Sequence, residues 1–381
     1  MEKLDLTYYD FYQGMVTPLI LILSILICLS IANHKEDIKY IVILFLWHTL
    51  FSIYYWFFSL SNTADAVGYY KASFGLKPNF SPGTHFTESL VYIITRVFDS
   101  NYLNTTLVSN IFGVIGLIYL YLSIKRFLPN IGKLWVLILF IPSMSFWSAG
   151  LGKDSISFMA TCLFLYGITE SRKPKLTIIL AFLTMFMVRP HIAFIMMASF
   201  VIYFIIKSKV HIVLKVLLLP IILIFSIVAL QYVQQYVGLG DVSLDSLDEY
   251  VNQRQGFNQE GGSSLDIASM SYPMQMFTYV FRPLPFEAHS IVALITSIEN
   301  TILLMLFMYI TFKSKFNFTV LFRNQNLWLF TYAFLTCTIL ALTTANLGIA
   351  TRQKWMFMPI FIYLLIYAFN NYKVNKTGIY Q

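Results

Sequence analysis

The chain has 381 residues, of which 58% are apolar and 12% are charged, whereas roughly 25% are charged in an ordinary soluble domain. A soluble fold this apolar would have too little polar surface to stay in solution, so ordinary soluble domains are excluded. The net charge of +8 is scattered between apolar runs, which indicates orientation in a membrane and argues against nucleic acid as a partner. Composition therefore predicts one all-α polytopic membrane domain covering 1–381.

Eleven apolar runs predict transmembrane helices, because a helix needs about 20 mostly apolar residues to cross a bilayer. The runs are 15–33, 40–60, 106–124, 134–150, 155–170, 176–189, 191–206, 212–234, 289–312, 327–345 and 355–371. The shortest, 176–189, is followed by Pro190 and is predicted to be a broken or re-entrant helix. The first run is expected to be a retained span, since its N-terminal flank is acidic and no small-x-small cleavage site follows.

The distribution of charge predicts the orientation of these spans. If residues 1–14 lie outside, the inside segments are 34–39, 125–133, 171–175, 207–215, 313–326 and the tail from 372. These segments hold 16 of the 26 Lys and Arg. Together with the adjoining Glu170 they hold only 3 of the 18 Asp and Glu, and the two besides Glu170 are Glu36 and Asp37. The positive-inside rule therefore predicts a cytoplasmic C-terminus.

The same topology places two long segments, 61–105 and 235–288, outside. Within the first, 86–98 has apolar residues at helical spacing and is expected to lie along the membrane interface. The second contains acids, glycines and prolines, and is predicted to carry short amphipathic helices and a mobile lid. The three cysteines are expected to be packing residues within spans, namely Cys28, Cys162 and Cys337.

Cations gather at the predicted outer ends of spans, where a charge near hydrocarbon is costly unless it snorkels or meets an anion. The seven are Arg96, Lys153, Arg189, Arg254, Arg282, Arg352 and Lys354. Arg189, Arg282 and Arg352 each have a proline or glycine nearby, which would hold the guanidinium at a span end. Because Arg binds phosphate bidentately, the three predict a shared diphosphate site; snorkelling to lipid phosphates is the alternative.

Three acids are candidates for chemistry. Asp65 follows the second predicted span and could take a proton from a hydroxyl nucleophile; a helix cap or solvated loop acid is the alternative. Asp154 is expected to pair with Lys153 or to cap the next helix. Glu299 lies well inside a predicted span and is a functional candidate by default, although Asn300 and a neighbouring tyrosine could satisfy it.

No metal site or cofactor is predicted. The external histidines His85, His191 and His289 are not spaced as ligands, and no Asp-x-Asp motif is present. Arginines and lysines would then take the place of a divalent metal beside a diphosphate.

Four short patches carry a family resemblance: Trp-Ser-Ala-Gly-Leu-Gly-Lys-Asp-Ser at 147–155, Arg-Pro-His at 189–191, Phe-Arg-Pro-Leu-Pro-Phe-Glu at 281–287 and Leu-Gly-Ile-Ala-Thr-Arg-Gln-Lys at 347–354. With the topology, they resemble bacterial O-antigen and exopolysaccharide repeat-unit polymerases of the Wzy type, including EpsG-like proteins. The resemblance covers most of the chain by topology but only these patches by motif.

The resemblance implies a GT-C-like glycosyltransferase with about eleven transmembrane helices in the bacterial inner membrane. It would take a glycan from a polyprenyl diphosphate at the outer face and pass it to a second lipid-linked repeat unit. The implied partners are polyprenyl-diphosphate-linked oligosaccharides, membrane lipids, a flippase and a chain-length regulator.

The resemblance also implies site residues. Asp65 matches, by location, the acid that serves as base or binds the acceptor. The implied diphosphate ligands are Arg189, Arg282, Arg352, Lys153 and Lys354. The expected glycan contacts are Tyr69, Tyr70, His191, Tyr272 and Glu287, although an interfacial aromatic belt explains the tyrosines equally well.

Three alternatives remain open. Another GT-C transferase would use a monophosphate-linked monosaccharide as its donor. A lipid-linked oligosaccharide flippase or other transporter would have charges through the membrane core and an inverted repeat, whereas here the unusual charges gather at one face. An O-acyltransferase would need a catalytic histidine in the membrane, for which His191 is the candidate.

Overall fold

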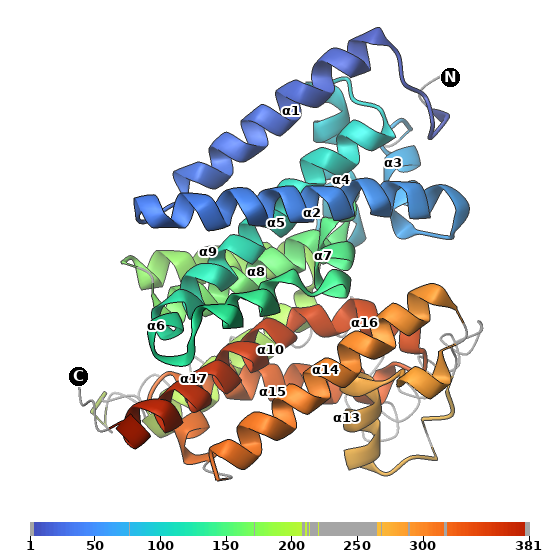
Figure 1. Cartoon of the computed structure of the whole chain (residues 1–381). Coiled ribbons are helices and arrows are strands. Elements are labelled where there is room, and N and C mark those ends of the chain that lie inside the picture. Colours follow the sequence, from blue (N-terminus) through green and yellow to red (C-terminus); the bar gives the residue numbers. More distant parts are fainter. Residues whose placement is uncertain are drawn as a thin grey trace. The chain divides into compact units, whose positions relative to one another are not determined.

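The computed structural model describes residues 4–75, 77–170, 172–207, 210, 211, 213, 220, 265–267, 269–288, 290–315 and 318–377. These residues form helices joined by loops, with no β-strand among them (Figure 1). The chain divides into two compact units. The first is Met1–Leu128 with Lys133–Arg189, and the second is Pro129–Gly132 with Pro190–Gln381.

The first unit is built around a central helix, α5. Its helices are α1 (Phe11–Ser30), α2 (Lys35–Ser61), α3 (Asp65–Ala72), α4 (Thr84–Val97), α5 (Tyr102–Ile124), η2 (Lys125–Phe127), η3 (Lys133–Phe140), α7 (Pro142–Ala149), α8 (Lys153–Thr169) and α9 (Pro174–Val188). Helix α5 packs against α1, α2, α7 and α8, and α8 also packs against α9. The short helix α6 (Leu128–Ile131) follows η2.

Glycines allow these close approaches to α5. A Cβ on Gly113 would lie 2.1 Å from the carbonyl oxygen of Ser148 and 2.4 Å from His48, and one on Gly116 would lie 2.8 Å from Phe158. Small residues at such crossings are typical of helices that pack within membranes. The sequence Gly-Val-Ile-Gly at 113–116 therefore permits the packing of α2, α7 and α8 on α5.

Two ion pairs join neighbouring segments at one end of the first unit. Lys125, after α5, lies 2.8 Å from Asp37 in the first turn of α2, and Arg126 lies 2.5 Å from Glu170, just beyond α8. We call these four residues the basic end. They join three segments that the charge pattern predicts on the same side of the membrane, around 37, 125 and 170.

The second unit contains α10 (Pro190–Lys207), α13 (Tyr272–Phe281), η4 (Pro285–Glu287), α14 (Ile291–Lys313), η5 (Phe318–Phe322), α15 (Asn326–Thr343), α16 (Leu347–Gln353), η6 (Lys354–Met356) and α17 (Met358–Thr377). Helix α15 packs against α10, α13 and α17. An aromatic contact supports the packing of α15 on α10, since the rings of Trp328 and Tyr203 stack with centroids 5.7 Å apart.

Six described helices are long and apolar enough to cross a membrane, and a pair bent by 61°, Leu347–Met356 with Met358–Lys376, would be a seventh. The six are Phe11–Ser30, Lys35–Ser61, Tyr102–Ile131, Pro190–Lys207, Ala293–Lys313 and Asn326–Thr343. The predicted count of eleven is thus not confirmed, although helices occupy ten of the eleven predicted runs. Nearly all of the remaining run, 212–234, falls outside the described residues.

Two of the predicted spans contain helices that are shorter than the hydrocarbon core is thick. The run 134–150 divides at Pro142 into η3 and the eight-residue α7. Helix α9 has 15 residues, or about 23 Å at 1.5 Å per residue, less than the roughly 30 Å hydrocarbon core. Helix α9 ends at Val188, before Pro190; that this run is a broken or re-entrant helix stays a prediction.

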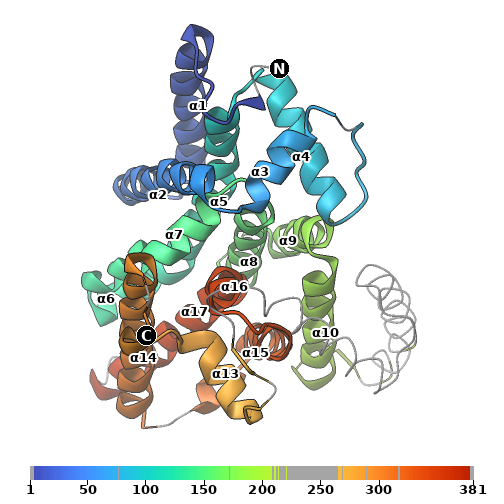
Figure 2. The ribbon, with the colours of Figure 1, turned by 90° about the vertical axis from the view of Figure 1, so that its right-hand side faces the viewer.

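The long segments predicted to be external are partly helical. In the first, α4 covers 86–97 of the predicted segment 86–98, and its position along the membrane interface stays a prediction. Helix α4 packs against α3, α5 and α9, and Figure 2 shows α3 and α4 side by side. In the second, one predicted short helix is present as α13, which packs against α15. The predicted lid lies largely outside the described residues. All three cysteines are buried and free.

Candidate functional site

The turn from α7 into α8 is closely packed. A Cβ on Gly150 would lie 2.6 Å from the Tyr55 ring, and one on Gly152 would lie 3.0 Å from the Tyr69 ring. Gly152 also has φ = 138°, which side chains other than hydrogen rarely allow. Ser155 Oγ donates to the Gly152 carbonyl at 2.9 Å. The sequence Gly-Leu-Gly is therefore required to turn the chain here.

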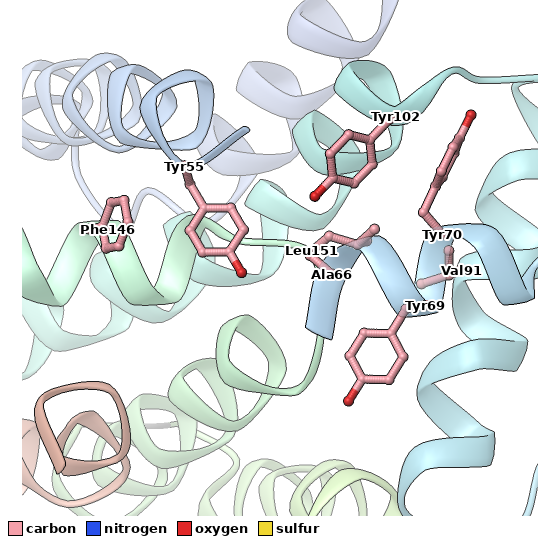
Figure 3. Close-up of a cluster of buried hydrophobic side chains, with 8 residues drawn as sticks. All are labelled: Tyr55, Ala66, Tyr69, Tyr70, Val91, Tyr102, Phe146 and Leu151. Carbon is pink, nitrogen blue, oxygen red and sulfur yellow. The ribbon is translucent and has the colours of Figure 1, made fainter. Parts of the chain in front are cut away.

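Buried tyrosines hold this turn against α2, α3 and α5, as Figure 3 shows. Tyr70 is fully buried between Phe74 and Tyr102, and only 8% of Tyr69 is exposed. Burial raises the pKa of the Tyr70 phenol well above its usual range, and the Asp99 carboxylate adds to the rise. These positions favour packing roles for Tyr69 and Tyr70, and their predicted glycan contacts stay predictions.

The turn presents two charged side chains to neighbouring elements. Lys153 Nζ donates to Thr84 Oγ1 at 2.7 Å, and Asp154 Oδ1 accepts from Arg189 Nη2 at 2.5 Å. Asp154 thus pairs with a distant arginine that the sequence analysis did not predict as its partner, and it also lies in the first turn of α8. A backbone bond from Gly83 to the carbonyl of Met187, 2.8 Å long, ties the start of α4 to the end of α9.

The Arg189 guanidinium retains donor capacity. Its side chain is 11% exposed and that of Asp154 is 17% exposed. The buried Nε of Arg189 has no hydrogen-bond partner among the described residues. A buried donor without a partner costs roughly 1–3 kcal/mol, so an anion that reached this nitrogen would be stabilised there.

Asp65 is the exposed first residue of α3. The capping position is occupied by Ala64, which makes no side-chain cap bond, although an acid in the first turn still favours the helix dipole. Asp65 and Tyr69 are four residues apart and share one face of α3. Tyr69 covers Gly152, and Asp65 precedes Tyr69 by about one helical turn, a rise of roughly 6 Å along α3.

We call Asp65, Thr84, Lys153, Asp154 and Arg189 the α8 corner. It lies at the N-terminal end of α8, whereas the basic end lies at the C-terminal end of this 17-residue helix. The corner combines an exposed carboxylate, a lysine and an arginine with an unused donor. Such a set can bind an anion and accept a proton from a nearby hydroxyl.

The second unit has its own arginine–acid pair, at the α13–α14 turn (residues 282–290). Arg282 Nε donates to Glu287 Oε1 at 2.8 Å, and Arg282 Nη2 contacts the same oxygen. Glu287 Oε2 accepts from the backbone N–H of Leu284 at 2.7 Å. The predicted glycan contact Glu287 therefore fixes Arg282 and the loop between them.

A group of buried polar side chains lies next to this turn. Asn300 Nδ2 donates to the Pro283 carbonyl at 3.2 Å and Asn300 Oδ1 accepts from Lys354 Nζ at 2.5 Å. Lys354 is 1% exposed and interacts electrostatically with the buried Glu299. Lys354, predicted to bind the diphosphate, thus supports the backbone next to Arg282 in this structure. That Asn300 and a neighbouring tyrosine satisfy Glu299 stays a prediction.

The remaining predicted residues are more accessible. Arg352, in the last turn of α16, and His191, near the start of α10, are half-buried. Tyr272, which begins α13, is 42% exposed and its hydroxyl lies 2.8 Å from Thr338 Oγ1. Arg189 belongs to the first unit and Arg282 and Arg352 to the second, so a site shared by all three stays a prediction.

The sequence interpretation missed a buried histidine. His48 Nδ1 lies 2.5 Å from Asn110 Oδ1 and His48 Nε2 lies 2.8 Å from Ser148 Oγ. The only signal was a histidine within an apolar run. This set has the composition of a nucleophile triad, but all three residues are buried and Ser148 Oγ also donates to the Met144 carbonyl. These three residues therefore join α2, α5 and α7, and they do not support the alternative that the protein is an O-acyltransferase.

The fold and these sites define a class of protein: an all-helical chain whose described part holds six or seven helices able to cross a membrane. No family model matches the chain, and no curated protein or solved structure matches it either. Among the described residues, no group of three or more His, Cys, Asp or Glu could hold a metal ion.

Proposed function

We propose that the protein is a polysaccharide polymerase of the GT-C type that transfers a polyprenyl-diphosphate-linked glycan onto an incoming lipid-linked repeat unit. The observation that carries the proposal is the α8 corner. There Lys153 and Asp154 begin α8, and Asp154 pairs with Arg189, whose buried Nε has no partner among the described residues. The exposed Asp65 begins α3, the helix whose Tyr69 packs over Gly152 in the same turn.

The chemistry requires a leaving-group site and a base. As the bond between the anomeric carbon and the diphosphate oxygen breaks, negative charge develops on the diphosphate. Arg189 and Lys153 would stabilise that charge more in the transition state than in the ground state. The N-terminus of α8 would add its partial positive charge.

Asp65 would take the proton of the acceptor hydroxyl while the oxygen of that hydroxyl forms its bond to the anomeric carbon. The proton then passes to solvent, because Asp65 is exposed. In the proposal, Arg282 and Arg352 hold the same diphosphate or that of the acceptor, and Glu287 and Lys354 keep the Arg282 loop in position.

The proposed orientation places the C-terminus in the cytoplasm and the α8 corner outside the inner membrane. The ion pairs of the basic end support it, because they join segments predicted inside while the corner lies at the other end of α8. A phosphatase active only in the periplasm, fused after Gln381, should be inactive. An active fusion would reverse the topology and remove the outer-face site.

Reconstitution tests the function. The purified chain in liposomes is supplied with polyprenyl-diphosphate repeat units on the face that carries the α8 corner, and products are separated by length. A ladder of lipid-linked multimers is expected. Extension only from a monophosphate-linked monosaccharide would indicate the other GT-C class. Translocation of the lipid without any extension would indicate a flippase, and either result would exclude a polymerase.

A further inference from the structure

A separate pocket of about 510 Å³ opens in the first unit, between the α1–α2 connection, α5, α8 and α9. It includes residues that follow the C-terminal end of α8, and so lies away from the α8 corner. Such a volume is within the usual range for small-molecule sites. Nothing in the proposed transfer reaction uses this pocket.

One part of the pocket is cationic. Arg172 and Lys173 line it, and its described lining contains no acid. The nearby acids Asp37 and Glu170 are engaged by the cations of the basic end, at 2.8 and 2.5 Å. Arg172 and Lys173 thus place two cationic side chains at the pocket, and an anion can complement them.

The other part is apolar and aromatic. Leu176 and Leu180 of α9 line the pocket and are 53% and 48% exposed. Tyr119 and Tyr166 form a wall, with ring centroids 4.9 Å apart. Cations at one side and exposed leucines along a helix suit a molecule with an anionic head and a hydrocarbon tail, because a free phosphate would leave the apolar part uncovered.

We infer that this pocket binds an anionic glycerophospholipid. Its phosphate contacts Arg172 and Lys173, and an acyl chain runs along Leu176 and Leu180. The site lies at the end that carries the basic loops, where anionic headgroups attract Lys and Arg. The inference is independent of the proposed polymerase activity and needs only that the protein crosses a bilayer.

The test uses the purified full chain in neutral detergent, titrated with dioleoylphosphatidylglycerol and followed by native mass spectrometry. Arg172→Gln/Lys173→Gln should weaken binding about twenty-fivefold, from roughly fivefold for each cation. Lys133→Gln/Lys175→Gln is the matched control, because it removes the same charge from residues that are exposed and do not line the pocket. The control should bind within about twofold of the unmodified chain.

Four outcomes would overturn the inference. They are unchanged binding in the pocket variant, an equal loss in the control, equal binding of dioleoylphosphatidylcholine, and displacement of the lipid by equimolar inorganic phosphate. Leu176→Asn separates a lipid site from a phosphate site, since it should weaken lipid binding while both cations stay. Equal elution profiles in size-exclusion chromatography confirm that each variant is folded.

Discussion

The two ends of the first unit hold ion pairs of different kinds. At the basic end, Asp37 is 3% exposed and accepts from Lys125 Nζ on both oxygens, at 3.0 and 2.8 Å, and from the Tyr121 hydroxyl at 3.1 Å. At the α8 corner, Asp154 accepts from one nitrogen of Arg189 while the Nε has no partner among the described residues. A saturated pair fixes helices in place, whereas an unsaturated one can still bind a ligand.

The backbones around the two pairs differ as well. Lys125 ends a long helix and Asp37 begins another, so the basic end joins regular elements. The α8 corner is built on a turn in which Gly150 and Gly152 lie under tyrosine rings, next to the break at Pro190. Binding residues are often held on such turns by a rigid scaffold. The comparison therefore predicts catalytic losses at the corner and stability losses at the basic end.

The largest expected effect is at Asp65. Asp65→Asn should lower polymer extension about a thousandfold, because an amide cannot take the proton from the acceptor hydroxyl. The measurement is multimer formation by proteoliposomes with matched protein content. Asp99→Asn is the control, since Asp99 is an exposed acid of the same segment, and it should retain full activity. Normal multimers from the Asp65 variant would remove this residue from the mechanism.

At the basic end, Lys125→Met should lower the free energy of unfolding by about 3 kcal/mol, because it leaves the buried Asp37 carboxylate without its cation. Thermal unfolding in detergent measures the loss. Activity per folded molecule should be unchanged. A variant that is stable but inactive would contradict the structural role of this end.

Arg189→Lys should lower the rate of extension about a hundredfold at unchanged expression. Lysine preserves the charge beside Asp154 but lacks the planar fork that binds two phosphate oxygens. The same substitution is expected to be harmful at Arg282 and Arg352. Arg96→Lys is the control, because Arg96 is exposed on α4. If all three lysine variants extend normally, these arginines are membrane anchors.

The smallest expected effect is at Glu170. Burial raises the pKa of this carboxyl and outweighs the attraction of Arg126. Because the pKa of Glu170 is raised in the folded state, this carboxyl contributes its full stabilisation when the pH is below its ordinary pKa. The contribution is lost as the pH rises through the raised pKa. Glu170→Gln should therefore change stability by less than about 1 kcal/mol at pH 7.5. Thermal unfolding that shows a larger loss would place Glu170 with Asp37 as a structural acid.

The positions of the helices could be predicted from the sequence because the length of an apolar run reflects the thickness of a bilayer. The prediction was least accurate where the run is interrupted, as at Pro142, since run length alone does not distinguish one span from two short helices. The accessible position of Asp65 was also predictable, because it comes directly after a complete span. Its role as a base is still a prediction.

What the sequence by itself determined is the set of apolar helices, the position of the glycine turn and the segregation of cations between loops, all of which depend on neighbours along the chain. Only the tertiary structure decided the partners: Arg189 for Asp154, Asn300 for Lys354, and Asn110 with Ser148 for His48. The physical reason is that these partners lie 35 to 100 residues apart. Their contacts depend on which helices pack together, and no local pattern of apolar and charged residues contains that information.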